Sequence, residues 1–112
     1  MNKYRLLIPI NKKSKARGLY QITEICLKEY NHYNKKEYKS IQLYNPNINY
    51  KIAYWYINIR IPQMLRYYKK EITIKNILIC YYGGISYLIE NKRLTKKIKN
   101  YIKKYFQYAL AK

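Results

Sequence analysis

The residue types that enzymes use for catalysis are scarce in this chain. It contains one histidine, His32, and its five acidic residues are all glutamates. The glutamates are scattered, and three of them occupy positions typical of solvated helices or turns, which argues against two carboxylates working as acid and base. The sequence also lacks a glycine-rich phosphate loop and a Ser/His/Asp set. We therefore expect no catalytic residue and predict that the protein is not an enzyme.

Two cysteines, Cys26 and Cys80, complete the inventory of reactive side chains. They lie far apart in the sequence and form no CxxC motif. His32 is placed near the end of a predicted helix, where a solvent-exposed imidazole is favourable. This set argues against a zinc site and against the disulfide framework of a secreted protein. We expect two buried thiols in a reducing compartment, no metal and no cofactor.

The net charge is the strongest signal in the sequence. The chain has 24 Lys and Arg against 5 acids, a formal net charge of +19 on 13.8 kDa. Its abundance of Lys, Ile, Tyr and Asn is typical of an AT-rich genome. Because Asp and Glu codons also tolerate such a bias, the shortage of acids indicates selection. A charge of this size causes self-repulsion unless a polyanion binds, which favours a phosphate backbone as the partner.

Basic residues are interleaved with aromatic ones in several places. Tyr54, Trp55 and Tyr56 precede Arg60, and residues 66–70 read Arg-Tyr-Tyr-Lys-Lys. In RNA-binding proteins, aromatic rings stack on bases while Lys and Arg meet phosphates. A single tyrosine more often belongs to a core or a protein interface, and we expect residues 54–56 at such an interface. The residues predicted to contact RNA are Lys12, Lys13, Lys15, Arg17, Arg60, Arg66, Lys69, Lys70 and Lys75.

The hydrophobic pattern predicts a mixture of strands and helices. Strands are expected over residues 4–10, 40–44 and 71–79, and amphipathic helices over 19–33 and 93–111, the second with a basic face. Residues 48–61 alternate with period two and are apolar on both faces. We predict that they form a long hairpin arm buried against another molecule. Asn45-Pro46-Asn47 has the composition of a turn, and Gly83-Gly84 that of a bend.

The chain is long enough for one small domain. We expect a single α+β domain over residues 1–92, which includes the hairpin arm 44–64, followed by a basic helical extension over 93–112. No apolar run reaches the roughly 20 residues of a membrane span, and the first residues lack the pattern of a signal or transit peptide. We therefore expect no membrane contact, and synthesis inside the organelle if the protein works in one.

The order of the predicted elements and several short motifs resemble the small-subunit ribosomal protein S-ten family. Residues 3–8, KYRLLI, are similar to that family's opening K-x-R-I-x-L strand, and residues 40–43, SIQL, to its P-I-P-L loop entry. Residues 56–62, YINIRIP, resemble Y-T-V-L-R-S-P, and residues 71–79 resemble the return strand E-I-R-T-H-K-R-L-I. The resemblance covers residues 3 to about 80 and implies a ferredoxin-like antiparallel sheet with helices on one face.

Two other families share shorter motifs with the chain. Residues 65–70 and 80–84 resemble parts of small-subunit ribosomal protein number eight. Residues 14–18 and Asn45-Pro46 resemble a thioredoxin-like organellar family that includes ribosomal proteins and a small subunit of respiratory complex I. All three resemblances imply an assembly component without chemistry, and only the complex I alternative lacks an RNA partner.

The S-ten resemblance implies a structural component of an organellar, specifically mitochondrial, small ribosomal subunit. The protein would be encoded in the organelle and act in translation in the matrix. Its partners would be ribosomal RNA and neighbouring small-subunit proteins, with neither a membrane nor a small-molecule substrate. Trp55 would be buried by a partner in the assembled particle, and Arg60 would contact RNA.

Overall fold

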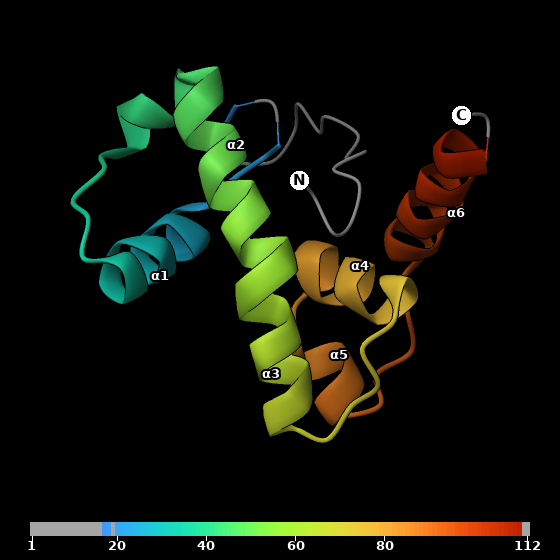
Figure 1. The fold of residues 1–112 in the computed structure, drawn as a ribbon. Helices are drawn as coiled ribbons and strands as arrows, with labels where there is room; N and C mark the ends of the chain where they lie inside the picture. The colour runs from blue at the N-terminus through green and yellow to red at the C-terminus, as the bar shows by residue number, and fades with distance from the viewer. Residues whose placement is uncertain (1–16, 19, 111–112) are drawn as a thin grey trace.

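The computed structural model describes residues 17, 18 and 20–110 of the chain, and this part is helical. The elements are α1 (Glu24–Asn34), the 3-10 helix η1 (Ser40–Tyr44), α2 (Pro46–Trp55), the π-helical turn η2 (Tyr56–Arg60), α3 (Ile61–Tyr67), α4 (Ile74–Gly83), α5 (Ser86–Ile89) and α6 (Lys96–Leu110) (Figure 1). Among the described residues there is no strand, only an isolated antiparallel bridge between Arg17 and Ile22. The predicted α+β, ferredoxin-like sheet is therefore wrong. The strand expected over 4–10 lies outside the described residues.

A long central helix replaces the predicted hairpin arm. The segments α2, η2 and α3 follow one another without a break and cross the middle of the molecule (Figure 1). Within η2 the Ile61 N–H donates to the Tyr56 carbonyl, five residues earlier. The next residue, Pro62, has no N–H and its ring crowds the preceding turn, so a wider turn at this point lets the helix continue. A helix that is apolar on all sides is stable when neighbours cover it, and here the chain itself supplies them.

Side-chain caps explain where the helices begin. Thr23, Thr73 and Thr95 each accept a hydrogen bond from the backbone N–H three residues later, at the starts of α1, α4 and α6. Asn45 accepts from the Asn47 and Ile48 N–H groups, and Pro46 occupies the first position of α2. Both features are typical helix starts. The sequence predicted a turn at Asn45-Pro46 and a strand over 71–79, and both predictions are wrong because these residues start helices.

Three apolar clusters hold the helices together. The first joins α1, η1 and α2 around Ile22, Leu43 and Ile52. The second packs the lower part of the central helix on α4 through Ile61, Leu65 and Ile77. In the third, α6 packs on α4, and Leu78, Tyr101 and Tyr105 are buried between them. In Figure 1, α1 accordingly lies on one side of the central helix, and α4, α5 and α6 lie on the other.

Helix α6 occupies much of the range 93–111 that the pattern assigns to a basic helix. The division of the chain at residue 92 stays a prediction. Within the described part of the chain, no helix combines the length and the apolar character that crossing a membrane requires.

Candidate functional site

Residues 17–22 form a tight loop that several hydrogen bonds hold in one conformation. Arg17 and Ile22 pair as a two-residue bridge, with N–H to carbonyl distances of 2.9 and 3.0 Å. Inside this bridge the Gln21 N–H and its side-chain amide both donate to the Gly18 carbonyl, at 3.2 and 2.9 Å. The loop therefore closes on itself immediately before α1 begins.

The side chain of Asn49, near the start of α2, clamps this loop by hydrogen bonds to its backbone. Its side chain is fully buried. Its amide nitrogen donates to the Arg17 and Leu43 carbonyls, both at 3.0 Å, and its oxygen accepts from the Tyr20 N–H at 2.8 Å. A buried amide is stable when its donors and acceptors find partners. Asn49 finds them at Arg17 and Tyr20 of the loop and at Leu43 of η1, so one side chain ties the loop to η1.

A second clamp reaches the loop from α4. The Tyr81 hydroxyl donates to the Tyr20 carbonyl at 2.5 Å. Burial raises the pKa of Tyr81 well above its ordinary value, so the hydroxyl keeps its proton and acts as a donor. The loop is thus held by side chains from two elements, Asn49 of α2 and Tyr81 of α4.

Two residues of the loop have a positive φ, which glycine adopts without strain and which is unfavourable for a residue with a Cβ. Gly18 has φ +77°, and a Cβ there would collide with the Asn49 side chain and the Leu43 carbonyl. Gln21 has φ 55°, in the left-handed region that residues with a Cβ rarely adopt. Lys35, Lys69 and Asn91 have similar φ values of 53°, 57° and 51°, so it is the hydrogen bonds from the Asn49 and Tyr81 side chains that distinguish this loop. The clamped loop is therefore our candidate functional site.

An aromatic row borders the loop. The Tyr20 ring meets the Tyr50 ring edge to face at 5.7 Å between centroids, and Tyr50 is 6.2 Å from Tyr54 one turn later on α2. Tyr20 and Tyr54 are half-buried, and Tyr50 is exposed. Rings of this kind combine an apolar face with a polar edge, and they commonly line ligand sites.

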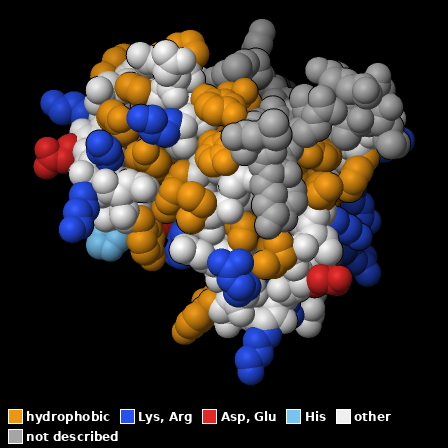
Figure 2. Space-filling view, viewed as in Figure 1, with side chains coloured by type: hydrophobic (Ala, Val, Ile, Leu, Met, Phe, Trp, Pro, Cys, Tyr) orange, Lys and Arg blue, Asp and Glu red, His pale blue; other side chains and the backbone are white. Residues whose placement is uncertain are grey.

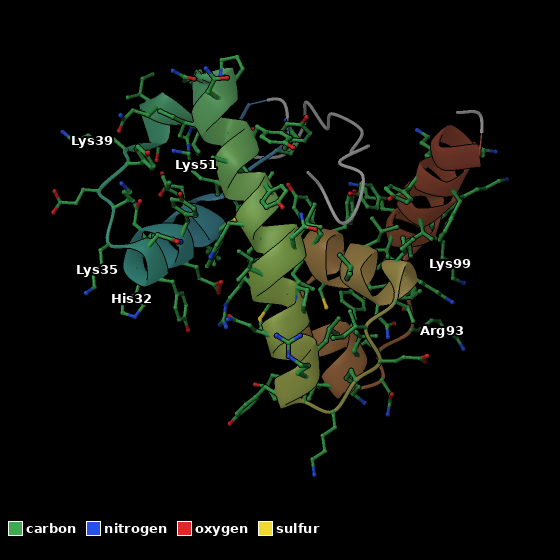
Figure 3. All side chains as sticks on the ribbon, viewed as in Figure 1. His32, Lys35, Lys39, Lys51, Arg93 and Lys99 are labelled. Carbon is green, nitrogen blue, oxygen red and sulfur yellow. The ribbon has the colours of Figure 1, made fainter. Side chains whose placement is uncertain are left out.

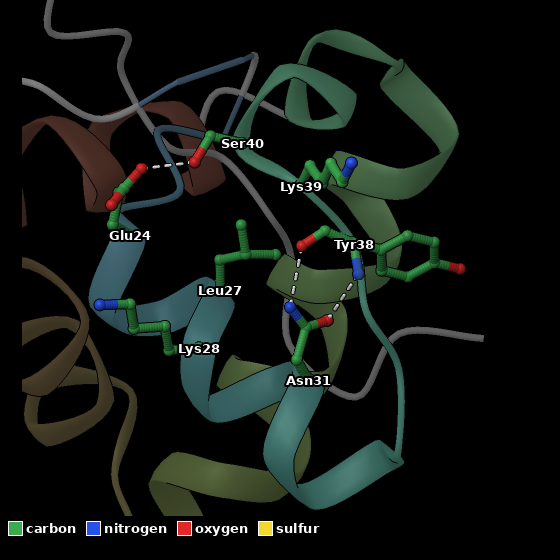
Figure 4. A pocket seen from close by; sticks show the side chains of 7 residues that line it. All are labelled: Glu24, Leu27, Lys28, Asn31, Tyr38, Lys39 and Ser40. Atoms are coloured by element: carbon green, nitrogen blue, oxygen red, sulfur yellow. Dashed lines mark hydrogen bonds between the residues drawn. The ribbon is translucent and has the colours of Figure 1, made fainter.

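A shallow pocket of about 300 Å³ lies between α1 and residues 38–40. Figure 4 shows Asn31 at its floor, exchanging two hydrogen bonds with the Tyr38 backbone, and Ser40 donating to Glu24. Glu24 also pairs with Arg17 of the loop at 3.3 Å. The Ser40 hydrogen bond, followed by the Arg17 charge, holds the pKa of Glu24 below its ordinary value. Near neutral pH Glu24 is therefore ionised, and its carboxylate accepts from Ser40 and Arg17.

None of the five glutamates lies in an apolar pocket. Glu29 is half-buried and pairs with Arg60 at 3.2 Å, while Glu90 is exposed and 3.9 Å from Lys92. Glu37 and Glu71 are exposed. A carboxyl group that donates a proton near neutral pH needs a surrounding that keeps it protonated. The described surroundings do not provide one.

Both thiols lie inside the protein, and the described residues provide no cluster of metal ligands. Cys26 and Cys80 are free and buried, and burial raises the pKa of both thiols, that of Cys80 to about 12. They are therefore protonated and not nucleophilic. In the part of the chain that the structure covers, no group of three or more His, Cys, Asp or Glu could hold a metal ion.

Those residues predicted to contact RNA that the structure describes do not form one surface. Lys12, Lys13 and Lys15 lie outside the described residues. Arg17 is part of the clamped loop, and Arg60 is bound to Glu29 with its guanidinium 4.7 Å from the centre of the Tyr33 ring. Arg66, Lys69 and Lys75 are exposed around the end of α3 and the start of α4, and Lys70 is half-buried there. That these four residues bind a polyanion stays a prediction.

The residues predicted to meet a partner protein lie on the central helix. Trp55 is buried within the chain, where it packs edge to face on Tyr30 at 5.4 Å. No partner is needed to cover it. Tyr54 and Tyr56 are half-buried, and their role at an interface stays a prediction.

Comparison with known proteins assigns the chain to a family. Residues 8–104 match the family model described as "Transglycosylase SLT domain". This match spans most of the sequence, so the chain belongs to the transglycosylase SLT family. Comparison with curated proteins and with solved structures gives no match. The matched range contains the whole clamped loop, both of its clamps and most of α6.

The family assignment corrects several predictions. The resemblance to ribosomal protein S-ten is wrong, and the two alternative families find no support. SLT domains are lytic transglycosylases, so the prediction that the chain is not an enzyme is wrong as well. Peptidoglycan is the substrate that such a domain implies. The predictions that the partners are ribosomal RNA and ribosomal proteins, and that there is no small-molecule substrate, are therefore wrong. The mitochondrial ribosome is also wrong as a location, because SLT proteins are related to the bacterial cell wall.

The sequence analysis missed the residues that build the loop. The sequence analysis places Gln21 in the predicted helix 19–33 and Asn49 in the predicted hairpin arm, and it singles out neither Gly18 nor Tyr81. One signal was available: a glycine directly after a basic run and directly before a helix suggests a positive φ. Nothing in the sequence links Gly18 to Asn49.

Proposed function

We propose that the protein binds the glycan strands of peptidoglycan at the clamped loop 17–22 and the bordering aromatic row, and acts on them as a transglycosylase. The observation that carries the proposal is the tight loop, which a buried Asn49 and the Tyr81 hydroxyl hold in one conformation. The family match, which includes this loop, supports the class of substrate.

The chemistry of the loop fits a polysaccharide. Sugar rings present hydroxyl groups around their edge and an apolar face of C–H groups. The row formed by Tyr20, Tyr50 and Tyr54 offers rings for the apolar face, while the Gln21 side chain, which donates to the Gly18 carbonyl, helps to hold the loop beside these rings. Because the hydrogen bonds from Asn49 and Tyr81 hold the loop before the ligand arrives, binding does not have to order it, which favours affinity and a defined orientation.

Transglycosylation requires that the oxygen of the glycosidic bond receives a proton as the bond breaks. The glycosyl group then passes to a hydroxyl group of a sugar instead of water. We assign binding and orientation of the strand to the loop. Glu24 is not assigned as the proton donor, since its lowered pKa keeps it ionised near neutral pH.

The experiment is digestion of purified peptidoglycan in ¹⁸O-labelled water, followed by mass spectrometry of the soluble fragments. We expect soluble glycan fragments without ¹⁸O at the cleaved bond, because the acceptor is a sugar hydroxyl. Fragments that carry ¹⁸O would indicate a hydrolase, and a folded protein that releases no fragments would contradict the proposed activity.

The variant Gln21→Ala tests the role of the loop. We expect it to keep the fold, since glutamine and alanine both carry a Cβ at this φ of 55° and the clamps hold the backbone, and to release fragments at least tenfold more slowly. The matched control is Gln63→Ala, an exposed glutamine on α3 far from the loop in sequence. Equal loss of activity in both variants would remove the argument for the loop.

A further inference from the structure

Helix α6 carries a continuous basic face. The exposed lysines of the helix are Lys96, Lys97, Lys99, Lys103 and Lys104. At about 100° per residue they fall within one side of the helix, roughly 160° wide. In Figure 2, Lys and Arg gather on the flank of the molecule over α6, and Figure 3 shows Lys99 and the preceding Arg93 there, on the opposite flank from His32, Lys35 and Lys39.

No acidic side chain balances this face. The sequence after Glu90 contains no Asp or Glu, and Glu90 itself is 3.9 Å from Lys92. Among the described residues, no carboxylate lies within ion-pair distance of Lys99 or Lys103. The face is therefore an unbalanced charge within this part of the molecule.

The arrangement is unfavourable for the helix itself. Lys99 and Lys103 are one turn apart, and like charges at that spacing destabilise a helix. Lys96, Lys97 and Lys99 also lie in the first turns, where the positive end of the helix dipole repels cations. Local arrangements that oppose the fold are expected where function requires them.

The opposite face of α6 is already occupied. Ile98, Tyr101 and Tyr105 are buried, and the two tyrosines pack on Leu78 of α4. A helix that lies in a membrane surface needs its apolar face for the lipid, so the buried side argues against that role. Single-stranded nucleic acids are usually bound by exposed rings on which bases stack. Here Tyr101 and Tyr105 point into the protein, and among the described side chains of α6 Phe106, at the edge of the basic face, is the one exposed ring, so the lysines are not accompanied by a row of rings on which successive bases could stack.

We propose that the basic face of α6 binds a linear phosphodiester polymer without bases, such as a polyol phosphate attached to the cell wall. Lysine ammonium groups act as point charges for phosphates and need no base edges or rings. This proposal rests on the proposed function, because peptidoglycan places the protein where such wall polymers are attached. Binding through α6 would concentrate the protein on the wall and leave the loop 17–22 available for glycan.

The experiment measures binding of the full chain to two wall preparations. One keeps its phosphodiester polymers, and the other has been treated with hydrofluoric acid, which cleaves phosphodiesters and leaves peptidoglycan. We expect the wild type to bind the untreated walls at least tenfold more tightly at low salt, with an advantage that disappears as salt rises. Equal binding to both preparations would overturn the proposal.

The double variant Lys99→Gln/Lys103→Gln should lose most of this advantage. Its matched control is Lys36→Gln/Lys51→Gln, which removes the same charge from exposed lysines before α2 and on α2. If both variants lose the same affinity, net charge and not the α6 face is responsible, and the proposal is wrong. Stronger competition by a DNA duplex than by soluble polyol phosphate would also overturn it.

The two proposals fail in different ways. If the wild type and both variants do not bind the treated peptidoglycan, the proposed function at the loop fails. The polymer site is judged only by the difference between the two wall preparations and between the two double variants.

Discussion

Replacement of Asn49 by alanine tests the clamp on which the candidate site depends. The change removes three hydrogen bonds, to the Arg17 and Leu43 carbonyls at 3.0 Å and from the Tyr20 N–H at 2.8 Å. A neutral hydrogen bond contributes about 1 kcal/mol net, so the three together contribute about 3 kcal/mol. Alanine favours a helix over asparagine by about half a kcal/mol, which acts in the opposite direction.

The loss of stability also depends on the backbone groups that bond to Asn49. Because Asn49 is fully buried, its removal leaves the Tyr20 N–H and two carbonyls without their partner in a closed space. Groups left unpaired in this way add to the loss unless the loop opens to water. We expect the free energy of unfolding to fall by about 3 kcal/mol, and cleavage of peptidoglycan to fall with it at temperatures where the variant is still folded.

Urea denaturation followed by circular dichroism measures the change. The matched control is Asn47→Ala, because Asn47 is the same residue type in the same turn of α2 but is exposed. It should change stability by no more than about 0.5 kcal/mol. A loss below about 1 kcal/mol for Asn49→Ala, or equal losses for the two variants, would refute the clamp.

Three further predictions concern the loop and the buried thiols. Gly18→Ala should destabilise the protein by about 2 kcal/mol or more in thermal denaturation, because the new Cβ would collide with Asn49 and Leu43. In the control Gly84→Ala, where φ is +97° and the new Cβ meets no atom within 4 Å, the only loss of stability should be that from backbone strain, about 1 kcal/mol. Because folding lowers the pKa of Glu24, the ionised carboxylate contributes to stability fully above its ordinary pKa of 4.5, and this contribution is lost as the pH falls below that value. The difference in unfolding free energy between wild type and Glu24→Gln should therefore shrink in acid. A difference that stays constant with pH would contradict the lowered pKa. Cys26 and Cys80 should resist iodoacetamide at pH 8 in the native protein and react in urea, and rapid labelling of the native protein would show that they are accessible.

The amphipathic helices were readable from the sequence, whereas the long apolar run was not. α1 and α6 each bury one face, so apolar residues recur at helical spacing. Residues 48–61 are buried on nearly every side of the central helix, and a run without a polar face has no distinctive period. Its length, and Asn45 followed by Pro46 at its start, favoured a helix over a strand. The tyrosines and isoleucines, common in strands, pointed to the wrong structure.

The candidate site could be predicted even less. Asn49 holds Arg17 and Tyr20, residues that lie 32 and 29 positions earlier, and Tyr81 reaches Tyr20 across 61 positions. Such contacts depend on how helices pack and leave no local pattern. The excess of basic residues did predict a polyanion, but net charge does not specify which one. That is why the charge led to ribosomal RNA.

The central claim is that the loop 17–22 binds glycan. Its most direct test is a titration of ¹⁵N-labelled protein with a soluble peptidoglycan glycan oligomer, followed by NMR at the backbone amides. We expect the amides of Tyr20 and Gln21 to shift in a saturable manner, with smaller shifts on α6, and the affinity to fall at least tenfold in Gln21→Ala. Saturable shifts that leave the loop amides unchanged would show that glycan binds elsewhere and would contradict the claim.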